Sequence, residues 1–335
     1  MSAAPTGGRK AIVTLTLAGA IDATYRVGML RTGAFVRAEA YEREVSGKGV
    51  NVAAALSAAG RATVAVVVMG EDDVAFAESR DQAGLLRIVP VPGATRVNTS
   101  IIDAAGSTTK VNAPAPPLAA HRWEAAVTAT LDEIEQRSAG WLVVSGTVPV
   151  LAETGEEIDL APLLSAARER GALIALDTSG TGLARALARP EGLSLIKPNT
   201  DELAELTGRA LRTMGDVEDA ARTLVERGVT TVFASLGADG LLVVGARATI
   251  HAAARARSVV NTAGAGDASL AGFLLGLGAS APDDVDALTV AASVAASWGA
   301  HAVAQSSTIV PGWEGVPAAV TDPRPDRARA LTEPA

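Results

Sequence analysis

The segment Asn261-Thr262-Ala263-Gly264-Ala265-Gly266-Asp267 is followed at once by the apolar run ASLAGFLLGL. Two glycines let the backbone turn tightly and expose its N–H groups, and the helix that the run predicts directs the positive end of its dipole to the same point. The segment therefore predicts an anion-binding site made of main-chain amides. Asp267 lies in the first helical turn, where it could accept a proton from an attacking hydroxyl. A second interpretation stays open, in which Asp267 only caps the helix, an effect of about 0.3 to 1 kcal/mol.

Around this segment, short β-branched or Leu-rich runs alternate with longer segments rich in Ala, Leu, Glu and Arg. Nearly continuous apolar runs are typical of parallel strands that helices cover on both faces. The expected strands are 62–69, 141–145, 173–177, 194–197 and 231–235, and the expected helices are 50–59, 123–137, 160–170, 201–206 and 217–227. Gly60, Gly171, Gly208 and Gly228 follow helices at positions that favour a left-handed cap. The sequence thus predicts an α/β fold with a mostly parallel sheet.

Two segments, about 22–44 and 94–112, interrupt this alternation. Polar and apolar residues alternate there without a helical period, which predicts antiparallel strands that form a small lid on one side of the sheet. Residues 311–335 are rich in Pro, Asp, Arg and Ala and show no periodicity, so we expect a loosely ordered C-terminal tail. Residues 1–310 are expected to form a single domain that includes the lid.

The composition excludes several classes of protein. The chain of 335 residues has no cysteine, which excludes disulfides and thiolate metal sites, and only three histidines. Its net charge of −8, from 29 basic and 37 acidic residues, gives no overall attraction to nucleic acid or to an anionic membrane. Residues 1–10 lack the apolar core of an export signal, and the longest apolar stretch, 288–303, is interrupted by polar residues as in a buried helix. We expect a cytoplasmic protein that holds anions locally.

Three further segments can approach a charged ligand. Ser46-Gly47-Lys48-Gly49-Val50-Asn51 places one of four lysines beside glycines at a helix start, which favours a phosphate or carboxylate partner; a tight turn with a solvated lysine is the alternative. Asn199 and Glu202 fit a capping box, and their spacing alone gives them no further role. The glycines of Ser235-Leu236-Gly237-Ala238-Asp239-Gly240 let the backbone come close to a ligand, although taken alone they predict a hairpin turn.

These segments, in this order and at these separations, resemble the PfkB (ribokinase-like) carbohydrate kinases. The resemblance extends from about residue 12 to about residue 307. It is greatest for the branch that phosphorylates sugar phosphates, which includes 1-phosphofructokinase, tagatose-6-phosphate kinase and the minor 6-phosphofructokinase. The motifs of that branch read here as GKGVN at 47–51, TRVN at 95–98, NAP at 112–114 and SGTVP at 145–149.

The resemblance implies a ribokinase-like three-layer α/β/α sandwich and an ATP- and Mg²⁺-dependent kinase. The foremost expected reaction is the conversion of fructose 1-phosphate to fructose 1,6-bisphosphate. Three alternatives stay open: a tagatose-6-phosphate or fructose-6-phosphate kinase, a kinase of an unphosphorylated sugar or nucleoside, and a non-catalytic sensor of sugar phosphates. The resemblance also implies a homodimer that pairs through the lid, without nucleic acid or membrane as a partner.

The resemblance implies a role for each matching residue. Asp267 would be the general base, beside an anion hole at Gly264, Ala265 and Gly266. The residues expected to bind the sugar phosphate are Asp22, Gly47, Lys48, Asn51, Arg96 and Ser145, with Arg37 as a third cation. The residues expected to bind the nucleotide are Lys197, Asn199, Ser235, Gly237 and Gly240. Asn199 and Glu202 would organise Mg²⁺ through water, since hard oxygen ligands suit that ion.

The chain departs from the branch in three segments. The chain has Ala18-Gly19-Ala20 where the branch has Asn-Pro-Ala, and Ser46 where the branch has a first glycine. Gly70-Glu71-Asp72-Asp73 replaces a glycine-rich stretch and adds acidity where a phosphate is expected. The changes at residues 18, 19 and 46 motivate the sensor alternative, and all the departures bear on which substrate is bound.

Overall fold

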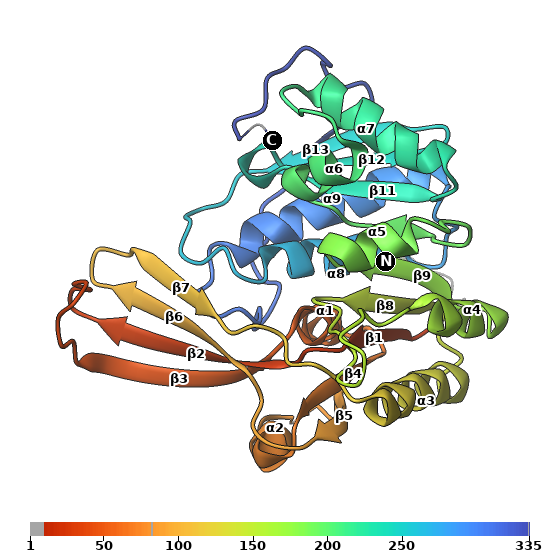
Figure 1. Ribbon diagram of the computed structural model, residues 1–335. Helices are drawn as coiled ribbons and strands as arrows, with labels where there is room; N and C mark the ends of the chain where they lie inside the picture. The colour runs from red at the N-terminus through yellow and green to blue at the C-terminus, as the bar shows by residue number, and fades with distance from the viewer. Residues whose placement is uncertain (1–9, 82, 334) are drawn as a thin grey trace, which may run out of the picture.

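The computed structural model describes residues 10–81, 83–333 and 335, which form a layered α/β/α body and a projecting lid (Figure 1). Within these residues the main sheet has ten strands in the order β14-β13-β12-β11-β10-β9-β8-β1-β4-β5. The seven strands from β11 to β5 in this order run parallel, and β12, β13 and β14 add antiparallel pairs at one side. The strand bounds are β1 (Ile12–Thr16), β4 (Thr63–Gly70), β5 (Leu86–Val91), β8 (Trp141–Ser145), β9 (Leu173–Asp177), β10 (Leu195–Ile196), β11 (Thr231–Ser235), β12 (Leu241–Gly245), β13 (Thr249–Ala254) and β14 (Ala319–Asp322).

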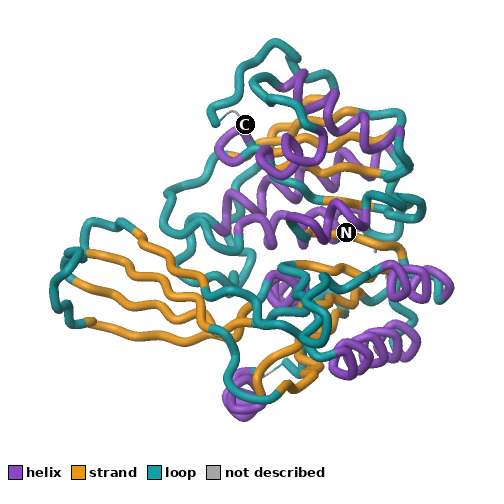
Figure 2. The backbone as a smooth tube through the Cα atoms, in the orientation of Figure 1, coloured by secondary structure: helices purple, strands orange, loops and turns teal. Residues whose placement is uncertain are grey.

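Helices cover both faces of this sheet (Figure 2). Side chains alternate along each strand, so that Leu142 and Val144 of β8 join one buried cluster and Trp141 and Val143 join the other. Helices α1, α8 and α9 pack on the second cluster, and α3 to α7 supply buried residues to the first. The helix bounds are α1 (Lys48–Ala58), α2 (Val74–Arg80), α3 (Ala120–Gln136), α4 (Ala161–Glu169), α5 (Gly180–Ala186), α6 (Thr200–Thr207), α7 (Met214–Glu226), α8 (Ala265–Leu277) and α9 (Val285–Ala302), with short 3₁₀ turns η1 (Glu71–Asp73) and η2 (Gly237–Asp239).

The five strands and five helices expected from the sequence are confirmed, with ends that shift by three residues or fewer. The four cap glycines all have positive φ, and the expected hairpin turn at 235–240 joins the antiparallel pair β11 and β12. Residues 288–302 of the apolar stretch lie in α9, which buries one face that includes Leu288, Ala291, Ala295 and Trp298. Across the described residues, no helix combines the length and apolarity that crossing a membrane requires.

The lid is a four-stranded sheet in the order β3-β2-β6-β7, which projects away from the body (Figure 1). Its strands are β2 (Ala20–Val27), β3 (Ala38–Ser46), β6 (Val97–Asp103) and β7 (Thr108–Asn112). The pairs β2/β3 and β6/β7 are antiparallel as expected, but the central pair β2/β6 is parallel. Strands β2 and β6 follow β1 and β5, which are themselves parallel, so both lid strands leave the same edge of the main sheet in the same direction.

The expectation of a loosely ordered tail is wrong for its last part. Strand β14 pairs with β13, and Leu331 is buried in the main core. Backbone pairing to an exposed sheet edge needs no side-chain periodicity, so the sequence pattern does not reveal it. Residues 1–9, where we found no export signal, lie outside the described residues.

Candidate functional site

The site begins at the start of α8, where Asp267 meets α1. Gly264 caps the helix with φ of 76°, and a Cβ added there would lie 2.5 Å from the Thr308 carbonyl oxygen, so a side chain does not fit. Asp267 is only 6% exposed, and its Oδ2 accepts a hydrogen bond of 2.8 Å from Asn51 Nδ2. Two segments 216 residues apart in sequence are thereby joined at the carboxyl edge of the sheet.

The surroundings of Asp267 change its acidity. Burial raises the pKa of Asp267 to about 6, and the negative charge of Asp177 adds to this, whereas Lys48, the Asn51 hydrogen bond and Lys197 act in the opposite direction. A carboxylate with a pKa near 6 is ionised at neutral pH and is a better proton acceptor than an ordinary aspartate. The position therefore suits a general base.

Asp177, at the end of β9, is a buried carboxylate of this site that the sequence reasoning did not include among the site residues. It is 1% exposed, and its Oδ1 lies 3.2 Å from Lys48 Nζ and 3.1 Å from Lys197 Nζ. Its Oδ2 accepts a hydrogen bond of 3.2 Å from Ser145 Oγ. Burial alone would raise the pKa of Asp177, but Lys197 and Lys48 outweigh burial and hold it below its usual value. The available signal was a carboxylate at the carboxyl end of a central strand, where ligands of such sheets bind.

Lys48 links the two expected halves of the site. Gly47, the N-cap of α1, has φ of 138°, and a Cβ there would lie 2.7 Å from the Thr16 side chain, so glycine is needed to bring the helix start against β1. The charge of Asp177 raises the pKa of Lys48 despite partial burial, and Asp267 and Glu202 add to the effect. Lys48 therefore stays protonated between the residues expected for sugar and for nucleotide.

The lid contributes Asp22 to this edge. Its carboxylate accepts hydrogen bonds from Ser46 Oγ at 2.8 Å and from Asn98 Nδ2 at 3.1 Å. Within the described residues, Asn51 Oδ1 and Asn98 Oδ1 are buried acceptors without a hydrogen-bond donor. Buried acceptors are normally paired, and a ligand rich in hydroxyl groups carries the donors that both need. The polar groups here fit a sugar.

The residues expected for the nucleotide lie at the neighbouring strand ends. Lys197 follows β10, and Ser235 ends β11 with its N–H bonded to the Pro198 carbonyl at 2.9 Å. Asn199 and Glu202 form the expected capping box at the start of α6, with bonds of 2.9 and 2.8 Å. No cluster of three or more metal-ligating side chains occurs in the part of the chain that the structure describes. The oxygen donors of Asn199 and Glu202 nevertheless suit Mg²⁺ held through water.

Comparison with known proteins identifies the family. The model of the pfkB family of carbohydrate kinases matches residues 12–310. The chain belongs to the pfkB family of carbohydrate kinases. It is 37% identical over 267 residues to a 1-phosphofructokinase of Rhodobacter capsulatus, covering 78% of this chain and 82% of that protein. It is 34% identical over 266 residues to a 1-phosphofructokinase of Haloferax volcanii, covering 78% and 83%.

Solved structures agree with this assignment. The crystal structure of phosphofructokinase-2 from Escherichia coli in complex with potassium superimposes with a TM-score of 0.79 at 27% identity, covering 90% of this chain and 96% of that one. The expected ribokinase-like α/β fold is therefore confirmed, and the protein is a carbohydrate kinase of the pfkB family.

In this pfkB kinase, Ser46 and Asp73 have structural partners that explain their presence. Ser46 donates to Asp22, so the hydroxyl that replaces a glycine orients a lid carboxylate. Asp73 accepts from Arg43 and from the Thr95 N–H, both at 2.9 Å, and thereby fastens the base of the lid to the body. The acidity of 71–73 is thus partly neutralised at Asp73.

Arg96 is held at the base of the lid by main-chain carbonyls. Its guanidinium donates to the oxygens of Ala18 at 3.0 Å, Ala113 at 3.1 Å and Gly19 at 3.4 Å. Burial lowers the pKa of Arg96, and the charge of Asp22 opposes the shift. Three of five N–H groups are used, which leaves two for an anion. Gly19 fits this arrangement, because a Cβ there would lie 2.6 Å from the Val68 carbonyl oxygen.

The structure does not bring Arg37 to these residues. It is exposed in the loop between β2 and β3, where its guanidinium lies 5.7 Å from the ring centroid of Phe35. Figure 1 shows this loop at the end of the lid that points away from the body. Asn51 pairs with Asp267, and Lys48 and Lys197 pair with Asp177. The charges of Asp177, Lys48 and Lys197 all act on Asp267. Asp22 and Arg96 lie at the lid base.

Proposed function

We propose that the protein transfers the γ-phosphoryl group of ATP to the 6-hydroxyl of fructose 1-phosphate and forms fructose 1,6-bisphosphate and ADP. The observation that carries the proposal is the buried Asp267, with a pKa near 6, in the first turn of α8. The resemblance to proteins named 1-phosphofructokinase, at up to 37% identity, supports this choice of sugar phosphate.

In the proposed reaction, the 6-hydroxyl oxygen of the sugar forms a bond to the γ-phosphorus, and its proton passes to Asp267 Oδ. The bond from the γ-phosphorus to the bridging oxygen breaks, and ADP leaves with that electron pair. The N–H groups of Ala265, Gly266 and Asp267 are the proposed donors to the γ-phosphoryl oxygens. Such a transfer requires mainly alignment and support of negative charge, which helix starts and lysines supply.

For the sugar, we propose that Asp22 and Asn51 bind hydroxyl groups from opposite sides, with Gly47 and Ser145 beside them. Arg96 and Lys48 would hold the phosphate already on the sugar. The two unused N–H groups of Arg96 and its fixed position support this role. Because Lys48 also lies in the field of Asp267 and Glu202, we expect it to act on the transferred group as well.

For the nucleotide, we propose that Lys197, Asn199, Ser235, Gly237 and Gly240 bind ATP. Mg²⁺ would neutralise charge on the ATP phosphates when bound, held through water by Asn199 and Glu202. Glu202 Oε2 is occupied by the Asn199 N–H, which leaves Oε1 for such water molecules.

A coupled ADP-release assay tests the proposal over fructose 1-phosphate, fructose 6-phosphate, tagatose 6-phosphate, ribose and adenosine. We expect the highest kcat/KM with fructose 1-phosphate and no turnover by Asp267→Ala. Arg96→Ala should raise the KM for fructose 1-phosphate, and Lys48→Ala should raise that KM and lower kcat. Unchanged KM values in both variants, with faster turnover of ribose or adenosine, would instead show a kinase of neutral acceptors.

We also propose a homodimer that pairs through the lid. The strand register puts Tyr41, Val97 and Val111 on one face of the lid and Asp22 and Asn98 on the other. The three apolar side chains are 51%, 40% and 61% exposed, which favours a partner surface on that face. Light scattering should give twice the monomer mass, and Val111→Glu should give the monomer; a monomeric wild type would contradict the proposal.

We place the enzyme in the cytoplasm because its proposed donor, ATP, is found there.

A further inference from the structure

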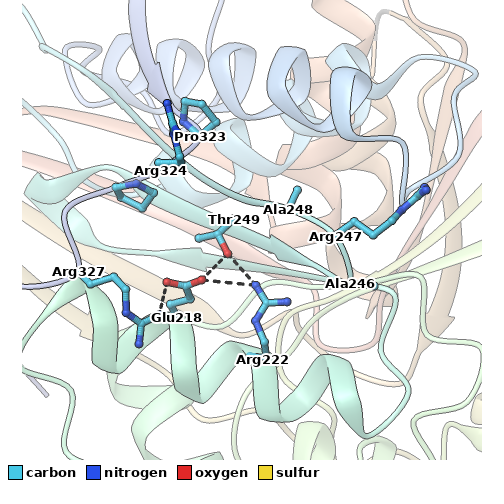
Figure 3. A pocket seen from close by; sticks show the side chains of 10 residues that line it. Glu218, Arg222, Ala246, Arg247, Ala248, Thr249, Pro323, Arg324 and Arg327 are labelled. Carbon is cyan, nitrogen blue, oxygen red and sulfur yellow. Dashed lines mark hydrogen bonds and ion pairs between the residues drawn. The ribbon is translucent and has the colours of Figure 1, made fainter.

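The C-terminal segment 319–335 lies beyond residue 310, where the match to the family ends. It is nevertheless fastened to the body in several places. Strand β14 pairs with β13, with Thr321 opposite Ala252. Arg327 forms ion pairs with Glu218 and Asp219 of α7, and Figure 3 shows Glu218 joined in turn to Thr249 of β13.

Main-chain hydrogen bonds continue this attachment toward the chain end. The N–H groups of Gly215 and Met214 donate to the carbonyls of Arg327 and Arg329, both at 2.9 Å. The Leu331 N–H donates to the Arg212 carbonyl at 2.9 Å, and the Leu331 side chain is 7% exposed. These contacts fix residues 327–331 against the connection between α6 and α7.

From this fixed position the segment reaches Asp239, the last residue of η2. Thr332 donates its N–H to Asp239 Oδ2 at 2.6 Å and its hydroxyl to Oδ1 at 3.1 Å. Arg329 forms an ion pair with Oδ1 at 3.3 Å. The side chain of Asp239 is 13% exposed, and these three contacts all come from the C-terminal segment.

Asp239 lies between Gly237 and Gly240, two of the residues proposed to bind ATP. Both glycines have positive φ, of 55° and 89°, and the Leu236 N–H closes the turn by donating to the Gly240 carbonyl at 2.8 Å. Because glycine adopts many other conformations as well, contacts from outside the turn add to its order. The Glu333 carboxylate lies beside the turn, since a Cβ added at Gly237 would be 3.2 Å from its Oε2. A turn that is already ordered loses less conformational entropy when it binds a ligand.

We propose that the C-terminal segment is a positioning element of the nucleotide site, in which Arg329 and Thr332 hold the 236–240 turn in its binding conformation through Asp239. The inference rests on the proposed function, because that function gives the turn its role. Arg329 contributes to nucleotide binding in a second way. Its positive charge offsets the Asp239 carboxylate, which would otherwise repel the phosphates of a nucleotide. The contacts predict an effect on nucleotide affinity and none on the sugar, whose proposed residues lie on the lid, α1 and β8.

The test is the double variant Arg329→Ala/Thr332→Ala in the full chain. We expect the KM for ATP to rise roughly tenfold, the scale of hydrogen bonds to a charged group, with an unchanged KM for fructose 1-phosphate. Calorimetric titration with MgATP should show the same loss of affinity without any sugar present. Thr332→Ser, which keeps both donors to Asp239, should retain wild-type values.

Arg327→Ala is the matched control, because it removes the ion pairs to α7 and leaves Asp239 with its partners. It should lower the unfolding temperature without changing the KM for ATP. The positioning role is overturned if the double variant keeps the wild-type KM for ATP. It is also overturned if the KM values for ATP and for fructose 1-phosphate rise equally and the unfolding temperature falls. In either case, turnover by the wild type still supports the proposed function. A wild type that neither binds MgATP nor releases ADP overturns both.

Discussion

Asp22 in the lid and Asp267 at the end of the main sheet are both carboxylates proposed to face the sugar, but their surroundings differ. Asp22 lies partly exposed on a thin sheet and is oriented by hydrogen bonds from two neighbouring strands. Asp267 is buried between two helices beside another carboxylate, and its pKa rises to about 6. The lid therefore orients a carboxylate, whereas the layered body raises the pKa of one, because burial removes water from around Asp267.

The largest expected effect is that of the variant Asp267→Asn. We expect kcat to fall by about 10²- to 10⁴-fold, the usual contribution of a positioned base. The variant should unfold at an equal or higher temperature at pH 7. Because folding raises the pKa of Asp267 from 3.8 to about 6, the free energy of unfolding falls as the pH rises from about 4 to about 6 and stays lower at pH 7, and asparagine removes the charge that causes this loss. A variant that loses stability and keeps its kcat would assign Asp267 a capping role only.

Asp177→Asn tests the buried charges beside it. The change leaves Lys48 and the buried Lys197 without their counter-charge, and we expect a loss of about 3 kcal/mol in the free energy of unfolding at pH 7. Because the pKa of Asp177 is lowered on folding, its stabilisation is present at neutral pH and is lost as the pH falls below about 4.

Denaturant titrations of Asp177→Asn at pH 7 and near pH 3.5 measure this difference. Ser145→Ala, which removes only the 3.2 Å hydrogen bond to Asp177, should lose about 1 kcal/mol. Equal losses at both pH values would show that the charge of Asp177 is not what stabilises the fold.

The pH dependence of kcat/KM sharpens the comparison further. We expect kcat/KM for the sugar phosphate to fall about tenfold per pH unit below pH 6, as Asp267 of the free enzyme takes up a proton. The negative charge of Asp177 contributes to the raised pKa, so the acid limb of Asp177→Asn should move to lower pH. The phosphate group of the substrate also titrates near pH 6. The quantity to measure is therefore the difference in the acid limb between the wild type and Asp177→Asn, which use the same substrate. Coincident profiles would contradict the coupling of the two carboxylates.

The smallest effect is expected in the lid. Ser46→Ala removes the 2.8 Å hydrogen bond to Asp22 and should raise the KM for the sugar phosphate by about three- to fivefold, with kcat and the unfolding temperature unchanged. Thr63→Ala is a suitable control, since it removes a 2.9 Å hydrogen bond to the Ile12 carbonyl at the opposite end of the sheet. A similar KM change in both variants would show that Ser46 acts through stability.

The sequence predicted most of the body because local patterns determine it. The run 141–145 is apolar at every position but its last, since helices cover both faces of β8, and such a strand is recognisable without its neighbours. The capping box of Asn199 and Glu202 is likewise a contact between residues three apart. The lid strands were recognisable from their alternation, but their parallel central pair was not, because pairing between β2 and β6 depends on where β1 and β5 end.

For the site, the sequence indicated which types of residue to expect but only a part of the contacts between them. By itself, the sequence determined the helix starts with their glycines, the strand ends and the family, since these depend on neighbouring residues or on motifs in a fixed order. Only the tertiary structure decided that Asp177 would lie between Lys48 and Lys197, that Arg37 would lie apart, and that the chain end would reach Asp239. Those contacts join residues far apart in the chain, and burial and charge act through space, where no local pattern records them.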